Sequence, residues 1–84
     1  MTTEMIEKFI DNKSRKHAVV NIHFKERSTV KGLFIRSPDY DELKYKNLWR
    51  IVHYEKMEEW NKTKNMDLSR IFNGLSFTRL TDEN

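Results

Sequence analysis

The chain opens on a segment whose apolar residues recur with the period of an α-helix. Four of them fall on one side of such a helix: Met5, Ile6, Phe9 and Ile10. Thr2 or Thr3 can cap its first turn, because a hydroxyl oxygen accepts a hydrogen bond from a free backbone N–H. The pattern predicts an α-helix over residues 1–14. Since its polar side carries mostly acidic residues, we expect it to lie across the domain rather than on a membrane surface.

From residue 18 the period changes to two, which is typical of half-buried strands. Within residues 18–25, four apolar residues alternate with others: Ala18, Val20, Ile22 and Phe24. A second strand is predicted over residues 29–36. Gly32 interrupts it, and a glycine inside a strand marks a bend or a close backbone approach. A third strand, rich in β-forming residues, is predicted over residues 45–54.

Two connections between these segments carry different signals. Residues 37–42 form an acidic stretch around the only proline of the chain, which predicts a loop. Residues 55–64 contain Met57 and Trp60 at helical spacing among charged residues, which favours a short helix. A polar strand extension followed by a loop is the alternative for this second segment.

The last part of the chain predicts two more strands, over residues 69–72 and 75–80. They flank an Asn73-Gly74 pair, which favours a tight hairpin because both residues tolerate a positive φ. Residues 81–84 are polar and are expected to form a frayed tail.

One helix followed by five short strands predicts a single, mainly β domain over residues 1–84. So many short strands in so few residues suggest a small, strongly bent five-stranded barrel of the SH3, Sm or OB type over residues 18–80. The chain has no Cys, which excludes disulfides, thiolate metal sites and a Cys nucleophile. A small domain without such cross-links relies on good packing, on oligomerisation, or on both.

Charge is distributed unevenly, although the net charge is only +3. Residues 13–36 carry seven basic residues against Glu26 alone, a balance of +6. A basic face fits an anionic partner, and a merely solvated surface is an equally favoured alternative. No apolar run reaches the roughly 20 residues of a membrane span, and the first residues lack the features of a signal peptide. We therefore expect a cytoplasmic protein with no membrane partner.

Catalytic and metal-binding patterns are absent from the sequence. None of the three histidines, His17, His23 and His53, stands at a metal-ligand spacing. There is no G-x-S-x-G nucleophile motif, and two glycines are too few for a phosphate-cradling loop. We expect a binding protein that is not an enzyme and that uses no cofactor and no metal.

Aromatic and basic residues lie beside each other at several positions. The pairs are Tyr40 with Lys44, Tyr45 with Lys46, Trp49 with Arg50, and Phe72 with Arg70. Single-stranded nucleic acid needs this combination, because rings stack on bases and cations hold phosphates. For Trp49, Phe72 and Phe77 a place in the hydrophobic core is the favoured alternative. Tyr40, which follows a proline in an acidic stretch, has less reason to be buried.

Two groups of segments carry a family resemblance. The first comprises an apolar strand at residues 20–24, a glycine in the next strand at residues 30–33, and an aspartate at residues 38–40. The second is the stretch of residues 71–75, with Asn73 where the family usually has Arg or Lys. Together with the N-terminal helix, this order resembles the Sm-like family, especially its bacterial RNA-chaperone branch.

The resemblance implies a homo-oligomeric ring that binds single-stranded RNA. The fourth strand of one subunit would pair with the fifth strand of the next. The implied subunit interface residues are Ile71, Phe72, Leu75 and Phe77. The implied RNA-binding residues are Tyr40 and Asn73 near the pore, Lys44 and Arg70 beside them, and Arg15 and Lys16 as a basic rim. The alternative is an SH3-like barrel that binds a protein partner through an apolar groove or an open sheet edge.

Overall fold

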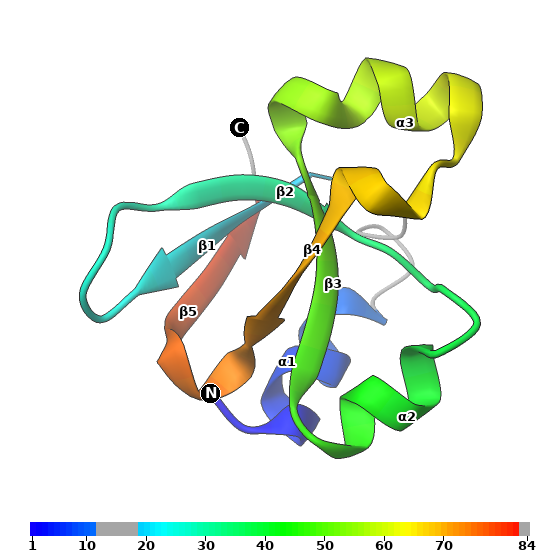
Figure 1. The fold of residues 1–84 in the computed structure, drawn as a ribbon. Coiled ribbons are helices and arrows are strands. Elements are labelled where there is room, and N and C mark those ends of the chain that lie inside the picture. Colours follow the sequence, from blue (N-terminus) through cyan, green and yellow to red (C-terminus); the bar gives the residue numbers. More distant parts are fainter. Residues whose placement is uncertain (12–18, 83–84) are drawn as a thin grey trace.

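A five-stranded antiparallel sheet with helices on both sides forms the body of the molecule (Figure 1). The computed structural model describes residues 1–11 and 19–82. The helices and strands are α1 (Thr3–Ile10), β1 (Val20–Phe24), β2 (Val30–Phe34), α2 (Tyr40–Tyr45), β3 (Leu48–His53), α3 (Met57–Thr63), β4 (Ser69–Asn73) and β5 (Phe77–Asp82). Three single 3₁₀ turns join some of them, η2 (Tyr54–Lys56), η3 (Met66–Leu68) and η4 (Gly74–Ser76). The prediction of an N-terminal helix followed by five strands is confirmed.

The strands are ordered β4-β3-β2-β1-β5, so that β4 and β5 lie at the two edges of the sheet. Each neighbouring pair is antiparallel. Within the described residues β4 and β5 do not pair with each other, so the sheet is not closed. Among the described residues, each of these edge strands has a neighbouring strand on one side only.

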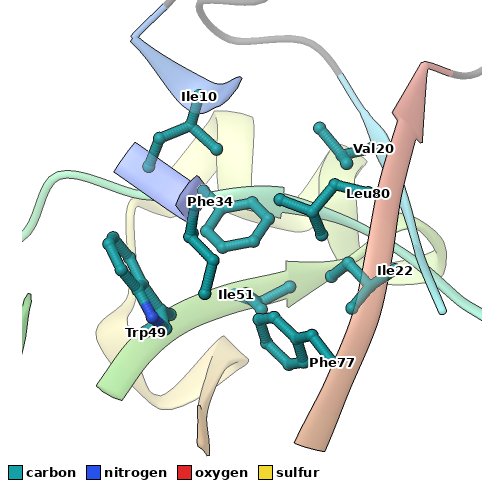
Figure 2. Packing of buried hydrophobic residues seen from close by; sticks show 9 residues of the cluster. Ile10, Val20, Ile22, Phe34, Trp49, Ile51, Phe77 and Leu80 are labelled. Atoms are coloured by element: carbon teal, nitrogen blue, oxygen red, sulfur yellow. The ribbon is translucent and has the colours of Figure 1, made fainter. Parts of the chain in front are cut away.

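Helix α1 covers one face of the sheet and closes the main hydrophobic core. Thr2 caps the helix, since its side chain accepts a hydrogen bond from the backbone N–H of Met5 at 3.2 Å. The inward side chains Ile6 and Ile10 are 0% and 5% exposed. Figure 2 shows how the strand residues of this core converge, namely Val20, Ile22, Phe34, Trp49, Ile51, Phe77 and Leu80. The predicted helix over residues 1–14 ends at Ile10, and residues 12–14 lie outside the described residues.

A second, smaller core lies on the opposite face of the sheet, under α3. Its buried members are Leu33, Ile35, Val52 and Trp60. Leu33 and Val52 are register partners on β2 and β3, and Trp60 of α3 packs with them. The short helix predicted within residues 55–64 is confirmed, because Trp60 gives this segment an apolar side that the sheet can bury.

Gly32 marks a close approach between β2 and β3, as predicted. A Cβ atom at this position would lie 2.5 Å from Ile51 Cγ2 and 3.0 Å from the Val52 carbonyl oxygen. The space between the two strands therefore admits only a glycine here.

The predicted Asn73-Gly74 hairpin is wrong. The pair starts η4, and β4 and β5 then diverge to opposite edges of the sheet. Asn73 has a φ of −86°, and its side chain accepts a hydrogen bond from the Leu75 N–H at 2.9 Å. Gly74 has no positive φ; it is required because a Cβ would collide with the side chains of Asn47 and Ile6. The local side-chain cap replaces the turn that the sequence pair favours.

Several predicted boundaries are also wrong. The strand predicted from residue 75 begins at Phe77, because Leu75 belongs to η4. The loop over residues 37–42 contains the start of α2, and the strand predicted from residue 45 begins at Leu48. Tyr45 lies on the helix and is 93% exposed. The tail predicted from residue 81 begins too early, because Thr81 and Asp82 pair with β1. Ala18 lies outside the described residues.

None of the helices formed by residues 1–11 and 19–82 has the length and apolar character needed to cross a membrane.

Candidate nucleic-acid interface

The predicted RNA-binding residues that the structure describes separate into two places. Tyr40 and Lys44 lie on α2, whereas Arg70 and Asn73 lie on β4. Arg15 and Lys16 lie outside the described residues.

Tyr40 and Lys44 are engaged within the protein. The Tyr40 ring is half-buried and meets the Trp49 ring edge to face at 6.0 Å. Burial raises the pKa of its hydroxyl above the ordinary value. The Lys44 ammonium lies 2.6 Å from a Glu7 carboxylate oxygen on α1 and 5.4 Å from the Tyr40 ring. That hydrogen bond raises the pKa of Lys44. The two side chains fix α2 to the core and to α1, which leaves them poorly placed to take a base or a phosphate.

Arg70 and Asn73 line a groove of about 1200 Å³ that runs beside β4. The β1–β2 connection, β3, η2 and β4 form its walls; the basic lining residues are Arg27, Arg50, Lys56 and Arg70, and the acidic ones are Glu55 and Asp67. The groove therefore collects residues that stand far apart in the sequence, and its cations outnumber its carboxylates.

Arg50 is neutralised by a carboxylate at the wall of the groove. Its guanidinium donates to both Asp39 oxygens at 2.9 and 3.1 Å, and to the Ser69 hydroxyl at 3.4 Å. The hydrogen bonds from Arg50 and then from Ser37 lower the pKa of Asp39 from 3.8 to about 2. This pair ties β3 to the start of α2 and contributes little free positive charge to the groove.

The other three groove cations have no such partner. Within the described part of the chain, no carboxylate forms an ion pair with Arg27, Lys56 or Arg70. Arg70 and Lys56 are exposed. The groove therefore offers an anionic ligand three positive charges that no ion pair holds in the described residues, beside the carboxylates of Glu55 and Asp67.

The Phe72 ring lines the groove, and the Phe24 ring packs against it. Phe72 and Phe24 are half-buried, and their ring centroids lie 5.8 Å apart at an angle of 44°. The Arg27 guanidinium lies over both rings, at 5.1 Å from Phe24 and 5.7 Å from Phe72. Phe24 in turn meets Phe77 edge to face at 5.2 Å, which connects the rings to the core.

Sequence reasoning missed three of these residues, Phe24, Arg27 and Lys56. Arg27 belongs to the basic segment of residues 13–36, so charge alone gave a signal for it. The sequence does not predict the contact between Arg27 and Phe72. In the sheet β2 and β3 lie between β1 and β4, and the contact forms because the sheet bends.

The implied subunit-interface residues differ in exposure. Ile71 and Leu75 are 47% and 64% exposed, and Phe72 is half-buried. Phe77 is 1% exposed, so its side chain belongs to the core and does not reach another subunit. Ile71 lies on the edge strand β4, and Leu75 lies on η4 just beyond its end.

The described residues contain no group of three His, Asp or Glu side chains placed to hold a metal ion. No protein-family model, curated protein or solved structure matches the chain.

Proposed function

We propose that the protein is a non-enzymatic, Sm-like RNA-binding protein that holds single-stranded RNA in the groove beside β4. One observation carries the proposal: Arg27, Lys56 and Arg70 line one groove without a carboxylate partner in the described residues, and the Phe72 ring lies among them. Cations bind phosphates, and a ring offers a surface to an unpaired base. Duplex RNA hides its base faces, so a single strand fits better.

The same proposal includes a strongly bent SH3/Sm-like barrel and a homo-oligomeric ring. Contact between Arg27 on the β1–β2 connection and Phe72 on β4 supports a strongly bent sheet, because three strand-to-strand steps separate β1 from β4. Two open edges support assembly, since β4 of one subunit can pair with β5 of another and so satisfy both.

Substitution of Arg70 tests the RNA groove. We expect Arg70→Glu to weaken binding of a fluorescein-labelled oligouridylate of about 15 nucleotides at least about tenfold at about 50 mM salt, and to reduce the salt slope by about 1. Fluorescence anisotropy measures both. Lys46→Glu is the matched control, because Lys46 is exposed and lies outside the groove. Absence of RNA binding by the wild type, or an equal loss in the control, would overturn the proposal.

The second candidate function is an SH3-like barrel that binds a protein partner. The exposed Ile71 and Leu75 beside the open edge of β4 favour it, because a partner strand could pair there and cover both side chains. A monomer in solution that binds no RNA would support this function instead.

A further inference from the structure

The Phe24–Phe72 ring pair and Arg27 form an aromatic corner of the groove. The inference drawn from this corner rests on the proposed RNA function. We propose that one nucleobase of a single strand stacks on the Phe72 ring there, in the place that the Arg27 guanidinium occupies, and that Arg27 then covers the outer face of the base. The observation that supports this proposal is the position of the Arg27 guanidinium, which lies 5.1 Å from the centre of the Phe24 ring and 5.7 Å from that of the Phe72 ring.

The rings of the aromatic corner are more exposed to solvent than the aromatic rings of the main core. Phe34, Trp49 and Phe77 are 9%, 1% and 1% exposed, so their faces are covered by the core. Phe24 and Phe72 are half-buried, and Phe72 lines the groove. A ring that is fixed from behind and accessible from the front is a preorganised stacking surface.

Arg27 is held in a way that allows it to move. Arg36 and Lys44 also lie over a ring, that of Tyr40, but an Asp11 or Glu7 carboxylate binds each of them at 2.6 Å. Arg27 is exposed and lies over the two rings, and it forms no ion pair within the described residues. Two stacked layers of about 3.5 Å each would place its guanidinium about 7 Å from the Phe72 ring, compared with 5.7 Å now, so an outward shift of about 1.3 Å is enough. A planar guanidinium also stacks on a base as well as it does on a ring.

Arg70 is positioned to hold the phosphate of the same nucleotide. Arg70 and Phe72 are two residues apart on β4 and so point to the same face of the sheet, about 7 Å apart along the strand. Their register partners, Ile51 and Trp49, both belong to the main core, which confirms that they share this face. One nucleotide can therefore place its base on Phe72 and its phosphate near Arg70.

Paired substitutions at Phe72 separate stacking from charge. Phe72→Leu keeps apolar volume against Phe24 and removes the ring, whereas Phe72→Tyr keeps the ring. We expect Phe72→Leu to weaken oligouridylate binding about 5- to 100-fold at every salt concentration without changing the salt slope, and Phe72→Tyr to bind within about threefold of the wild type. Anisotropy at about 50, 100 and 200 mM salt measures this.

A spectroscopic signal reports the base contact directly. In an oligouridylate that carries one 2-aminopurine, stacking on a ring quenches the emission of that base. We expect quenching with saturating wild type and Phe72→Tyr, and its loss with saturating Phe72→Leu. A variant that is merely less stable would still quench once it is bound.

Each remaining outcome decides the inference. If Phe72→Leu binds and quenches like the wild type while Arg70→Glu binds weakly, the stacking site is wrong and the phosphate-binding groove stands. If Phe72→Tyr fails as Phe72→Leu does, with both losing thermal stability, Phe72 has only a structural role and the inference is again overturned. If the wild type binds no RNA at about 50 mM salt, the proposed function itself fails.

Discussion

Asp39 fixes the connection between β2 and β3 with a single carboxylate. It receives the Arg50 guanidinium on both oxygens, and the Ser37 hydroxyl on one of them. The sequence predicted an acidic loop here and not the role of this residue, because the partner lies eleven positions away on β3. The Arg50 guanidinium that holds Asp39 also bonds Ser69 at the start of β4, so this carboxylate helps to shape one wall of the groove.

The pH dependence of stability tests this anchor. The pKa of Asp39 falls from 3.8 to about 2 on folding, so its ionised form stabilises the folded state above about pH 4. That contribution is lost as the pH falls from about 4 to about 2. We expect Asp39→Asn to be less stable than the wild type at pH 6, and the difference in urea midpoints to shrink toward pH 2. A difference that stays constant across this range would show that the charge of Asp39 contributes nothing.

Gly32 shows which residue-scale features a sequence reveals. An isolated glycine in a strand pattern has few explanations, and the close approach to Ile51 and Val52 is one of them. Tyr40 shows the opposite case. Its half-buried ring depends on Trp49 and on the position of α2, and no local pattern encodes either of them.

At the scale of elements, α3 is an apolar cover on the face of the sheet that α1 leaves open. Figure 1 shows α3 and α1 on opposite sides of the strands. Trp60 is 8% exposed and packs with Leu33, Ile35 and Val52. The helix has seven residues, too few to be stable alone, so this packing holds it in place.

Truncation of Trp60 measures that cover. We expect Trp60→Ala to lower the free energy of unfolding by about 3 kcal/mol, because it empties the centre of the smaller core. Lys62→Ala on the same helix is the control, since Lys62 is 73% exposed and only pairs with Glu58 at the surface. Urea denaturation followed by circular dichroism gives both values. A loss below about 1 kcal/mol for Trp60→Ala would mean that α3 does not stabilise the sheet.

Element type was predictable from periodicity, whereas the partners of the elements were not. A period of two identified β1, whereas β2 was predicted from an apolar stretch and buries side chains on both faces, with Phe34 in the main core and Leu33 in the smaller one. The prediction of a hairpin between β4 and β5 was wrong, because the strand order places those strands at opposite edges of the sheet. The Asn73-Gly74 pair is a local signal and carries no information about that order. Helix α2 was missed because a six-residue helix without a fully buried residue has no apolar stripe to detect.

At the scale of the whole molecule, the open edges decide which assembly is possible. In the described part of the chain β4 and β5 each have a strand neighbour on one side only, and neither contains a proline that would block a new strand. The groove lies along β4, so pairing at this edge would place a second subunit next to Arg70 and Phe72. Residue pattern predicted these two strands, and the Sm-like resemblance implied that they are edges, but the groove depends on the bend that brings Arg27 to Phe72.

Substitution of two apolar side chains at the β4 edge tests whether the protein assembles into a ring of subunits. We expect light scattering to give about five to seven chain masses for the wild type, and a single chain mass for the double variant Ile71→Glu with Leu75→Glu, because two buried charges oppose strand pairing. Tyr45→Glu is the matched control. It also places a charge on an exposed apolar position, 93% exposed, but on α2 rather than on β4 or η4, and it is expected to remain oligomeric. A monomeric wild type would exclude the ring and favour the protein-binding barrel, whereas an oligomer that survives the double variant would place the subunit contact elsewhere.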